Sequence, residues 1–237
     1  NLRQPFHILY GLSIKRRAWS LAEAAIIISL IIAFGTSLAV FTDSYSGAKA
    51  ADARYVLGAD IKISATAAST KEYHSSDAEI FMANDIEAIT PVIYSIHNVI
   101  LRSDRTSDVA NLAAIDPLSY QAVAPVKDEH FLDGSAENAL LLLQDKPQAV
   151  LLSFDMAQFL QLRVGDIMHI LLGRAKEEQT EIAVEVVGFY EKLPGFPDGA
   201  DALMNITLHE EAITSIPVSF FLVKTKAITD LSLEDAT

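Results

Sequence analysis

The stretch QAVLLSFDMAQFLQLRVGDIMHI, residues 148–170, predicts a strand, a helix, a turn and a second strand in immediate succession. The apolar run at 149–153 is typical of a buried strand, and the segment at 154–162 has the apolar spacing of a short helix. The sequence RVGD at 163–166 then indicates a turn, and residues 167–173 indicate a returning strand. Such alternation is typical of domains that mix strands and helices.

Ser153 lies where the first strand meets the helix, which is also where some hydrolases hold a nucleophilic serine. That strained elbow needs small residues two positions before and two positions after the serine, and here those residues are Leu151 and Asp155. A helix cap fits better, because the hydroxyl can accept a first-turn N–H and Asp155 complements the positive end of the helix. We therefore interpret Ser153 as an N-cap.

The turn and the strand that follow it also carry polar residues. We expect Gly165 to adopt a positive φ and Asp166 to accept local hydrogen bonds. His169 alternates with apolar residues in the returning strand, where a structural role is the better interpretation. These side chains are therefore predicted to shape the chain.

No motif in the sequence points to a catalytic, cofactor-binding or metal-binding site. The histidines form no H-E-x-x-H pair, and the acidic pairs lack the ligand spacing of a calcium loop. Neither G-x-x-x-x-G-K-[ST] nor G-x-G-x-x-G occurs. We predict no catalytic, cofactor or metal site residues in this chain, so any ATP and Mg²⁺ would be held by a partner polypeptide.

The segment LAEAAIIISLIIAFGTSLAVF, residues 21–41, predicts a transmembrane helix. Glu23 is its only charged residue, and a helix of this length spans roughly 31 Å, about one bilayer core. A cleaved signal peptide is the alternative, with KRRAWS as its basic region and AKA at 48–50 as its cleavage site. The apolar run is longer than a usual signal core, so we expect a permanent anchor.

The flanks of this span predict its orientation. Basic residues at 3 and 15–17 precede it, which favours a cytoplasmic N-terminus and a main domain outside the cytoplasmic membrane. Residues 1–20 are predicted to form an amphipathic interfacial helix, with a disordered leader as the alternative. Residues 42–58 are predicted to be a helical stalk that stops at Gly58.

Composition limits the partners of the outer part. Residues 42–237 carry 30 acidic and 14 basic residues, a net charge of −16, which excludes nucleic acid as a partner. Cysteine is absent, so a hydrophobic core must stabilise the fold without disulfides. The periodicity of residues 59–237 predicts an α+β extracytoplasmic domain, which we expect to have two lobes, one inserted into the other. Its further strands are expected at 60–66, 91–103, 107–116, 181–192 and 217–226, and its further helices at 75–89, 117–123 and 135–146. A loop is expected at 193–201 from its prolines and glycines, and a helix start at 229–237.

Three segments, read in order behind the basic leader, the span and the stalk, resemble one family. They are VLGADIKI (56–63), AVLLSFDMAQFLQLRVGDIMHI (149–170) and EVVGFYEKLPGFP (185–197). They are similar to the first membrane helix and the extracytoplasmic domain of FtsX-like ABC transporter permeases, the group that includes the MacB and LolC proteins. The resemblance covers nearly the whole chain.

This resemblance implies a mixed α/β domain with a porter-like lobe and an inserted second lobe. It also implies a cytoplasmic ABC ATPase as partner, together with the remaining transmembrane helices or a second permease half. ATP hydrolysis would be relayed by mechanotransmission, with residues 42–58 as the lever, to a lipoprotein, lipid, peptide or cell-wall partner. A whole permease carries further spans, so we expect these residues to be part of one; four-span and ten-span permeases both stay open.

Two other functions compete with this one. The single span and the acidic outer domain also fit a membrane-anchored binding or sensor module that works alone. An anchored hydrolase is the third possibility, and it depends on Ser153 alone.

Overall fold

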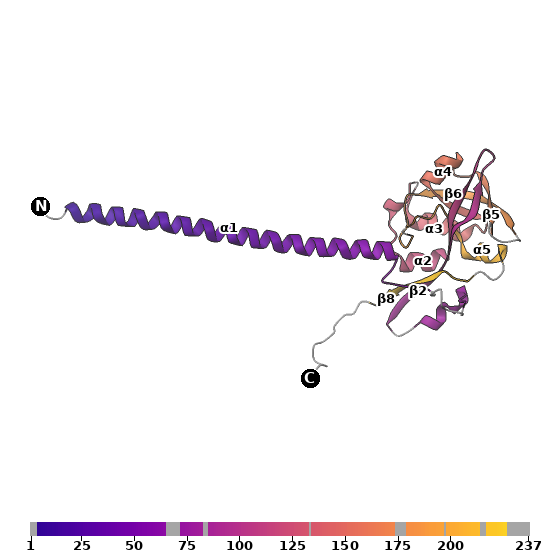
Figure 1. Ribbon diagram of the computed structural model, residues 1–237, viewed down its shortest axis with the longest axis horizontal. Helices are drawn as coiled ribbons and strands as arrows, with labels where there is room; N and C mark the ends of the chain where they lie inside the picture. Colours follow the sequence, from indigo (N-terminus) through magenta and orange to yellow (C-terminus); the bar gives the residue numbers. More distant parts are fainter. Residues whose placement is uncertain are drawn as a thin grey trace, which may run out of the picture. The chain divides into compact units, whose positions relative to one another are not determined.

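The structure is a computed structural model that describes residues 4–64, 72–82, 85–132, 134–173, 179–196, 198–213 and 217–226. The chain divides into two compact units, Asn1–Asp52 and Ala53–Thr237. The described residues of the first unit, from Gln4 onward, are helical. The second unit contains the sheet, the shorter helices and the last turn of the long helix (Figure 1).

Helix α1 runs without interruption from Gln4 to Leu57. It contains one stretch, Ala18–Leu57, that is long and apolar enough to cross a membrane. The large apolar side chains between Ile26 and Phe41 are all more than half exposed, so no protein surface covers them. The predicted span and stalk therefore both lie in helix, as expected. No break separates the predicted interfacial segment from the span, and its position in the headgroup plane stays a prediction.

The helix ends where the sequence predicts. Gly58 has a φ of +86°, and its N–H donates to the carbonyl oxygen of Arg54 at 2.9 Å. This left-handed residue closes the last turn of α1 and directs the chain into the first strand.

The second unit is built on one eight-stranded mixed sheet in the order β1-β8-β2-β3-β7-β4-β6-β5. Strand β2 also pairs with β5, which closes six of these strands into a ring. The pairs β3/β7 and β4/β6 are parallel, and the other pairs are antiparallel. The strands are β1 (Ile61–Ser64), β2 (Ile86–Arg102), β3 (Ser107–Ile115), β4 (Ala149–Ser153), β5 (Ile167–Leu172), β6 (Thr180–Tyr190), β7 (Ala202–Asn205) and β8 (Phe220–Thr225).

Helices cover both faces of this sheet. They are the 3₁₀ helices η1 (Ser75–Phe81) and η2 (Asp128–His130), and the α-helices α2 (Pro117–Val123), α3 (Ala136–Asp145), α4 (Phe154–Leu160) and α5 (Ile206–Ala212). In β4, Leu151 belongs to a core cluster with α2 and α3, whereas Val150 and Leu152 belong to a second cluster with α4 and α5. All residues of β4 are buried, which explains its continuous apolar run.

Most of the predicted elements are confirmed, including β4, α2 and the turn before β5. The helix predicted at 75–89 is wrong: only the short η1 forms, and the chain is already a strand at Ile86. Residues 86–89 form a strand because they pair with β8. The proline at position 91 also disfavours helix in the residue before it. The prediction missed β7 and α5. A helix start at 229–237 lies outside the described residues.

The fold class is confirmed as a long apolar helix followed by a mixed α/β domain. The two-lobe prediction is not confirmed, because residues 53–237 form one compact unit around a continuous sheet.

Candidate joint between helix α1 and the loop at residues 193–201

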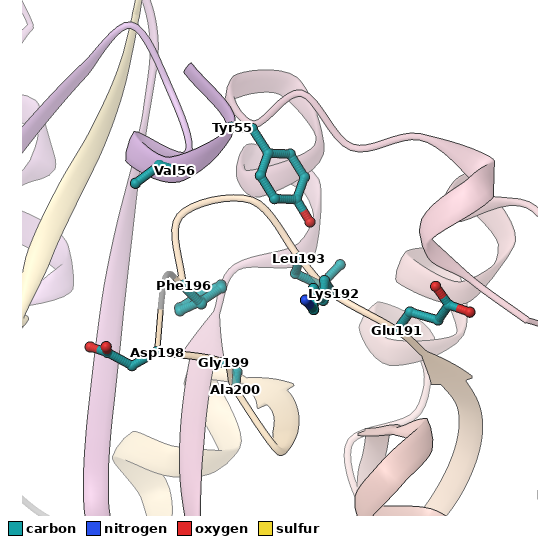
Figure 2. Close-up of a pocket in the computed structure, with 9 residues that line it drawn as sticks. All are labelled: Tyr55, Val56, Glu191, Lys192, Leu193, Phe196, Asp198, Gly199 and Ala200. Atoms are coloured by element: carbon teal, nitrogen blue, oxygen red, sulfur yellow. The ribbon is translucent and has the colours of Figure 1, made fainter. Parts of the chain in front are cut away.

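The last turn of α1 contacts a loop that follows β6. We call this loop, residues 193–196 and 198–201, the joint loop. The N–H of Gly195 donates to the carbonyl oxygen of Tyr55 at 3.0 Å. Figure 2 shows Tyr55 and Val56 on the helix end, beside the loop residues Leu193 and Phe196.

Two glycines make this approach possible. A Cβ atom added to Gly58 would lie 2.5 Å from the Cα of Gly195, closer than real Cβ contacts. Gly58 and Gly195 also have positive φ angles of +86° and +90°, a region that L side chains rarely adopt. The contact of backbone with backbone therefore depends on glycine at both positions.

Side chains from several elements hold the carbonyl groups of the joint loop. Three tyrosine hydroxyls, one lysine ammonium and one asparagine amide donate to loop oxygens. These bonds are Tyr120 to Pro194 at 2.7 Å, Lys62 to Gly195 at 3.2 Å, Tyr94 to Gly199 at 2.8 Å, Asn111 to Gly199 at 3.1 Å and Tyr190 to Ala200 at 2.8 Å. The donors come from β1, α2, β2, β3 and β6, so the loop is fixed from several sides.

The tyrosine donors are protonated throughout the physiological range. Burial raises the pKa of Tyr120 and Tyr190 well above the usual value near 10. Burial, with the negative charges of Asp198 and Asp201, raises the pKa of Tyr94 to about 12. These hydroxyls therefore remain hydrogen-bond donors to the loop.

Phe196 anchors the joint loop in the core. Its side chain is 5% exposed and its ring centroid lies 5.3 Å from that of Tyr94, 6.2 Å from that of Tyr120 and 6.2 Å from that of Phe220. The ammonium of Lys62 lies 3.7 Å from the centroid of the Phe220 ring, on its face. The loop thus continues into the core cluster that packs against α2 and α3.

A carboxylate makes a second connection at the end of α1. One oxygen of Asp60 lies 3.0 Å from Nε of Arg54, which is in the last turn of the helix. The other oxygen accepts from the N–H of Thr225 at 3.0 Å and from its hydroxyl at 3.3 Å. Asp60 therefore links the helix end to the last residue of β8.

A pocket of about 440 Å³ opens beside the joint. Tyr55, Glu191, Lys192, Phe196 and Asp198 are among the residues that line it (Figure 2). The described part of the chain contains no group of three His, Asp or Glu side chains that could hold a metal ion. The geometry of this region is that of a close contact between the helix end and the joint loop, with an adjoining cavity.

The residues that the sequence singled out lie elsewhere, at the α4–β5 corner (residues 153–166). The hydroxyl of Ser153 accepts from the N–H of Met156 at 3.3 Å, which confirms the N-cap. Gly165 has a φ of +94°, and Asp166 accepts from the N–H of Arg163 at 2.8 Å, as predicted.

His169 has a surface role in the strand that follows this corner. Its Nδ1 lies 3.3 Å from a carboxylate oxygen of Glu181, which also contacts Arg102. The absence of catalytic, cofactor and metal residues from the chain stays a prediction.

Sequence reasoning missed the joint and one buried histidine. The LPG triplet indicated only a loop, and Gly58 indicated only the end of a helix. His209, in α5, is 1% exposed, and its Nδ1 has no hydrogen-bond partner within the described residues. Burial lowers the pKa of His209 to about 4, so its ring is neutral at pH 7.

A sequence profile of the MacB-like periplasmic core domain matches residues 24–233. The chain belongs to this family. The match confirms the resemblance seen in the sequence and covers both the end of α1 and the whole described domain. A MacB-like domain is the extracytoplasmic part of an ABC transporter permease and is generally non-catalytic.

Solved structures give related but distant matches. The extracellular domain of the noncanonic ABC-type transporter YknZ from Gram-positive bacteria is 14% identical, with a TM-score of 0.47 over 71% of this chain and 85% of that chain. The periplasmic region of MacB from Actinobacillus actinomycetemcomitans is 16% identical, with a TM-score of 0.48 over 73% of this chain and 77% of that chain. A search of curated proteins gave no match. The family assignment therefore rests on the sequence profile.

Proposed function

We propose that this chain is the first part of an ABC permease unit that couples ATP hydrolysis by a separate ATPase to work outside the membrane. In this proposal residues 21–41 cross the cytoplasmic membrane from a cytoplasmic N-terminus. Residues 42–58 act as the lever, and residues 59–237 act on a lipoprotein, lipid, peptide or cell-wall partner. The observation that carries the proposal is the fixed attachment of the last turn of α1 to the joint loop.

A lever transmits displacement only if the helix and its attachment are both stiff. Helix α1 is continuous to Leu57, and its end meets the domain through a backbone hydrogen bond, two close-packed glycines and an ion pair. A passive tether needs none of these contacts, and a glycine- or serine-rich linker would serve it. The joint therefore favours transmission of movement over simple anchoring.

The energy source in this proposal is another polypeptide. The chain contains no phosphate-binding loop, so the ATPase partner would hold ATP and Mg²⁺. Further transmembrane helices or a second permease half would complete the membrane part. The net charge of −16 in residues 42–237 favours partners other than nucleic acid.

The alternative function is a membrane-anchored binding or sensor module. The pocket beside the joint favours it, since a ligand there would contact both the helix end, at Tyr55, and the joint loop, at Phe196. In that case the same joint would carry a signal inward instead of mechanical work outward.

Affinity purification from native membranes separates the two functions. The full-length gene product is tagged, extracted in mild detergent and compared with a tagged single-span protein of unrelated fold. We expect an ABC ATPase to co-purify in a fixed ratio with the tagged protein only. If no ATPase is enriched over the control, and the gene stops soon after residue 237 without further spans, the anchored module replaces the permease.

A further inference from the structure

We propose that Asp60 is the positioning residue that makes the end of α1 and strand β8 move as one body. We call the set Arg54, Asp60 and Thr225 the Asp60 clasp. This inference rests on the proposed function, because it names the contact through which the lever would act. It assigns to a partly buried carboxylate a role that neither the family nor the fold assigns.

The clasp bridges the glycine at which α1 ends. Gly58 separates the helix from β1, and without a Cβ atom its backbone has the fewest steric limits on bending. Arg54 precedes this glycine and Asp60 follows it, and their side chains meet at 3.0 Å. A bend at Gly58 would pull these two groups apart, so the ion pair resists it.

The second oxygen of Asp60 completes the sheet at its margin. Strand β1 begins at Ile61, which pairs with Val223, so β1 has no strand residue opposite Thr225. The Asp60 carboxylate takes that place and accepts both the N–H and the hydroxyl of Thr225. Hydrogen bonds to a carboxylate are stronger than those between neutral groups.

Strand β8 passes any displacement to the centre of the domain. It lies between β1 and β2, and Figure 1 shows β8 and β2 side by side. Beyond β8, strand β2 continues to Arg102, which pairs with His169 of β5. A continuous hydrogen-bonded path therefore leads from the clasp to the far end of the sheet.

The clasp has little to do with keeping the domain folded. The side chains of Arg54 and Asp60 are 46% and 26% exposed, and neither belongs to a core cluster. Partly exposed ion pairs contribute little to stability. Loss of the Asp60 carboxylate should therefore loosen the connection at Gly58 and leave the fold intact.

A matched ion pair provides the control. Glu87 and Lys224 meet at 2.7 Å and join β2 to β8 close to the clasp. This pair has similar exposure and also touches β8, but within the described residues its ion pair does not involve α1. Glu87→Ala therefore reports the effect of losing any ion pair at this margin.

Spin-label distances measure the stiffness of the joint. The chain has no cysteine, so Asp52→Cys on α1 and Asp104→Cys at the tip between β2 and β3 provide two unique labels in it. The full-length protein is reconstituted in nanodiscs, alone and with its co-purified ATPase trapped by vanadate. Double electron–electron resonance then gives the width of the distance distribution.

We expect one narrow distribution for the parent protein and for Glu87→Ala, unchanged by vanadate trapping. Asp60→Ala should broaden it about twofold and make it depend on the nucleotide state, while the domain still unfolds in one cooperative thermal transition. Asp60→Asn, which keeps one acceptor oxygen, should give an intermediate width and serves if the alanine variant does not fold. A narrow distribution in both Asp60 variants, or equal broadening in Glu87→Ala, would overturn the clasp. If no ATPase is found, the permease proposal fails, but the widths without nucleotide still decide the role of Asp60.

Discussion

The joint loop and the α4–β5 corner both turn the chain through a left-handed glycine, yet the side chains that hold them differ in sequence distance. At the corner the side-chain caps are local: Ser153 reaches Met156, and Asp166 reaches Arg163, each three residues away, while the backbone N–H of Gly165 donates to Val186 of β6. At the joint the partners are distant, and Lys62 donates to Gly195 across 133 residues. A turn capped by its own side chains keeps its shape without help from distant elements. A turn held by distant side chains changes its position when those elements move. This difference is why the proposed lever function is assigned to the joint.

The largest expected difference between the two regions comes from their glycines. Gly58→Ala adds a Cβ at a positive φ and 2.5 Å from the backbone of Gly195, which should cost about 3 kcal/mol of unfolding free energy. Gly165→Ala has the same φ problem with open space around it, and should cost about 1 kcal/mol. Urea unfolding of both variants checks this. Equal losses would mean that the glycine contact at the joint is not tight.

The stability of the domain should also depend on pH through His209, independently of the two glycine turns. The pKa of His209 is about 4 in the fold and near 6.5 when unfolded, so the unfolded chain binds the extra proton first. The stability that depends on a neutral His209 is fully present above pH 6.5. As it is lost, the free energy of unfolding falls by about 2 kcal/mol between pH 7 and pH 5. Urea midpoints at both pH values measure it, and His209→Gln should flatten the slope. A slope unchanged in His209→Gln would assign the pH effect to other groups.

Removing the hydroxyl of Tyr120 tests one of the long-range hydrogen bonds that hold the joint loop. Tyr120→Phe keeps the ring but leaves the buried carbonyl oxygen of Pro194 without its donor, so it should cost about 1.5 kcal/mol. The amide hydrogen of Gly195 should also exchange faster, because the loosened loop makes a weaker hydrogen bond to α1. Hydrogen exchange followed by mass spectrometry tests both regions at once. Faster exchange at 163–166 as well would point to general loosening of the domain.

The smallest expected effect is at the corner. Ser153→Ala removes an N-cap and should cost about 1 kcal/mol. ATP-dependent work by the assembled permease should not change, since the cap has no part in chemistry or in the joint. Thermal unfolding measures the loss. Hydrolytic activity that disappears in Ser153→Ala would instead revive the anchored hydrolase.

The same contrast explains what the sequence could predict. The strand, cap, helix and turn between 149 and 166 follow from local patterns, so each was predicted and found. The helix expected at 75–89 failed because β8, more than 130 residues later, pairs with 86–92 and makes it a strand. Strand β7 gave no periodic signal, because its residues are all buried between two neighbours.

The joint itself was beyond sequence patterns for the same reason. Tyr120, Tyr94 and Lys62 look like ordinary core or surface residues until the fold brings them to the loop. The family resemblance identified the correct domain family because it depends on the order of several segments. It gave no indication that Asp60 joins Arg54 to Thr225.

In the proposed permease, the outer domain moves when a separate ATPase binds ATP. A donor fluorophore at Asp104→Cys, in the full-length protein with its ATPase in nanodiscs, measures this movement by energy transfer to acceptor-labelled lipid headgroups. We predict that ATP with vanadate changes the transfer efficiency, and that an ATPase unable to bind ATP abolishes the change. An efficiency that stays constant while the bound ATPase is active would contradict the account.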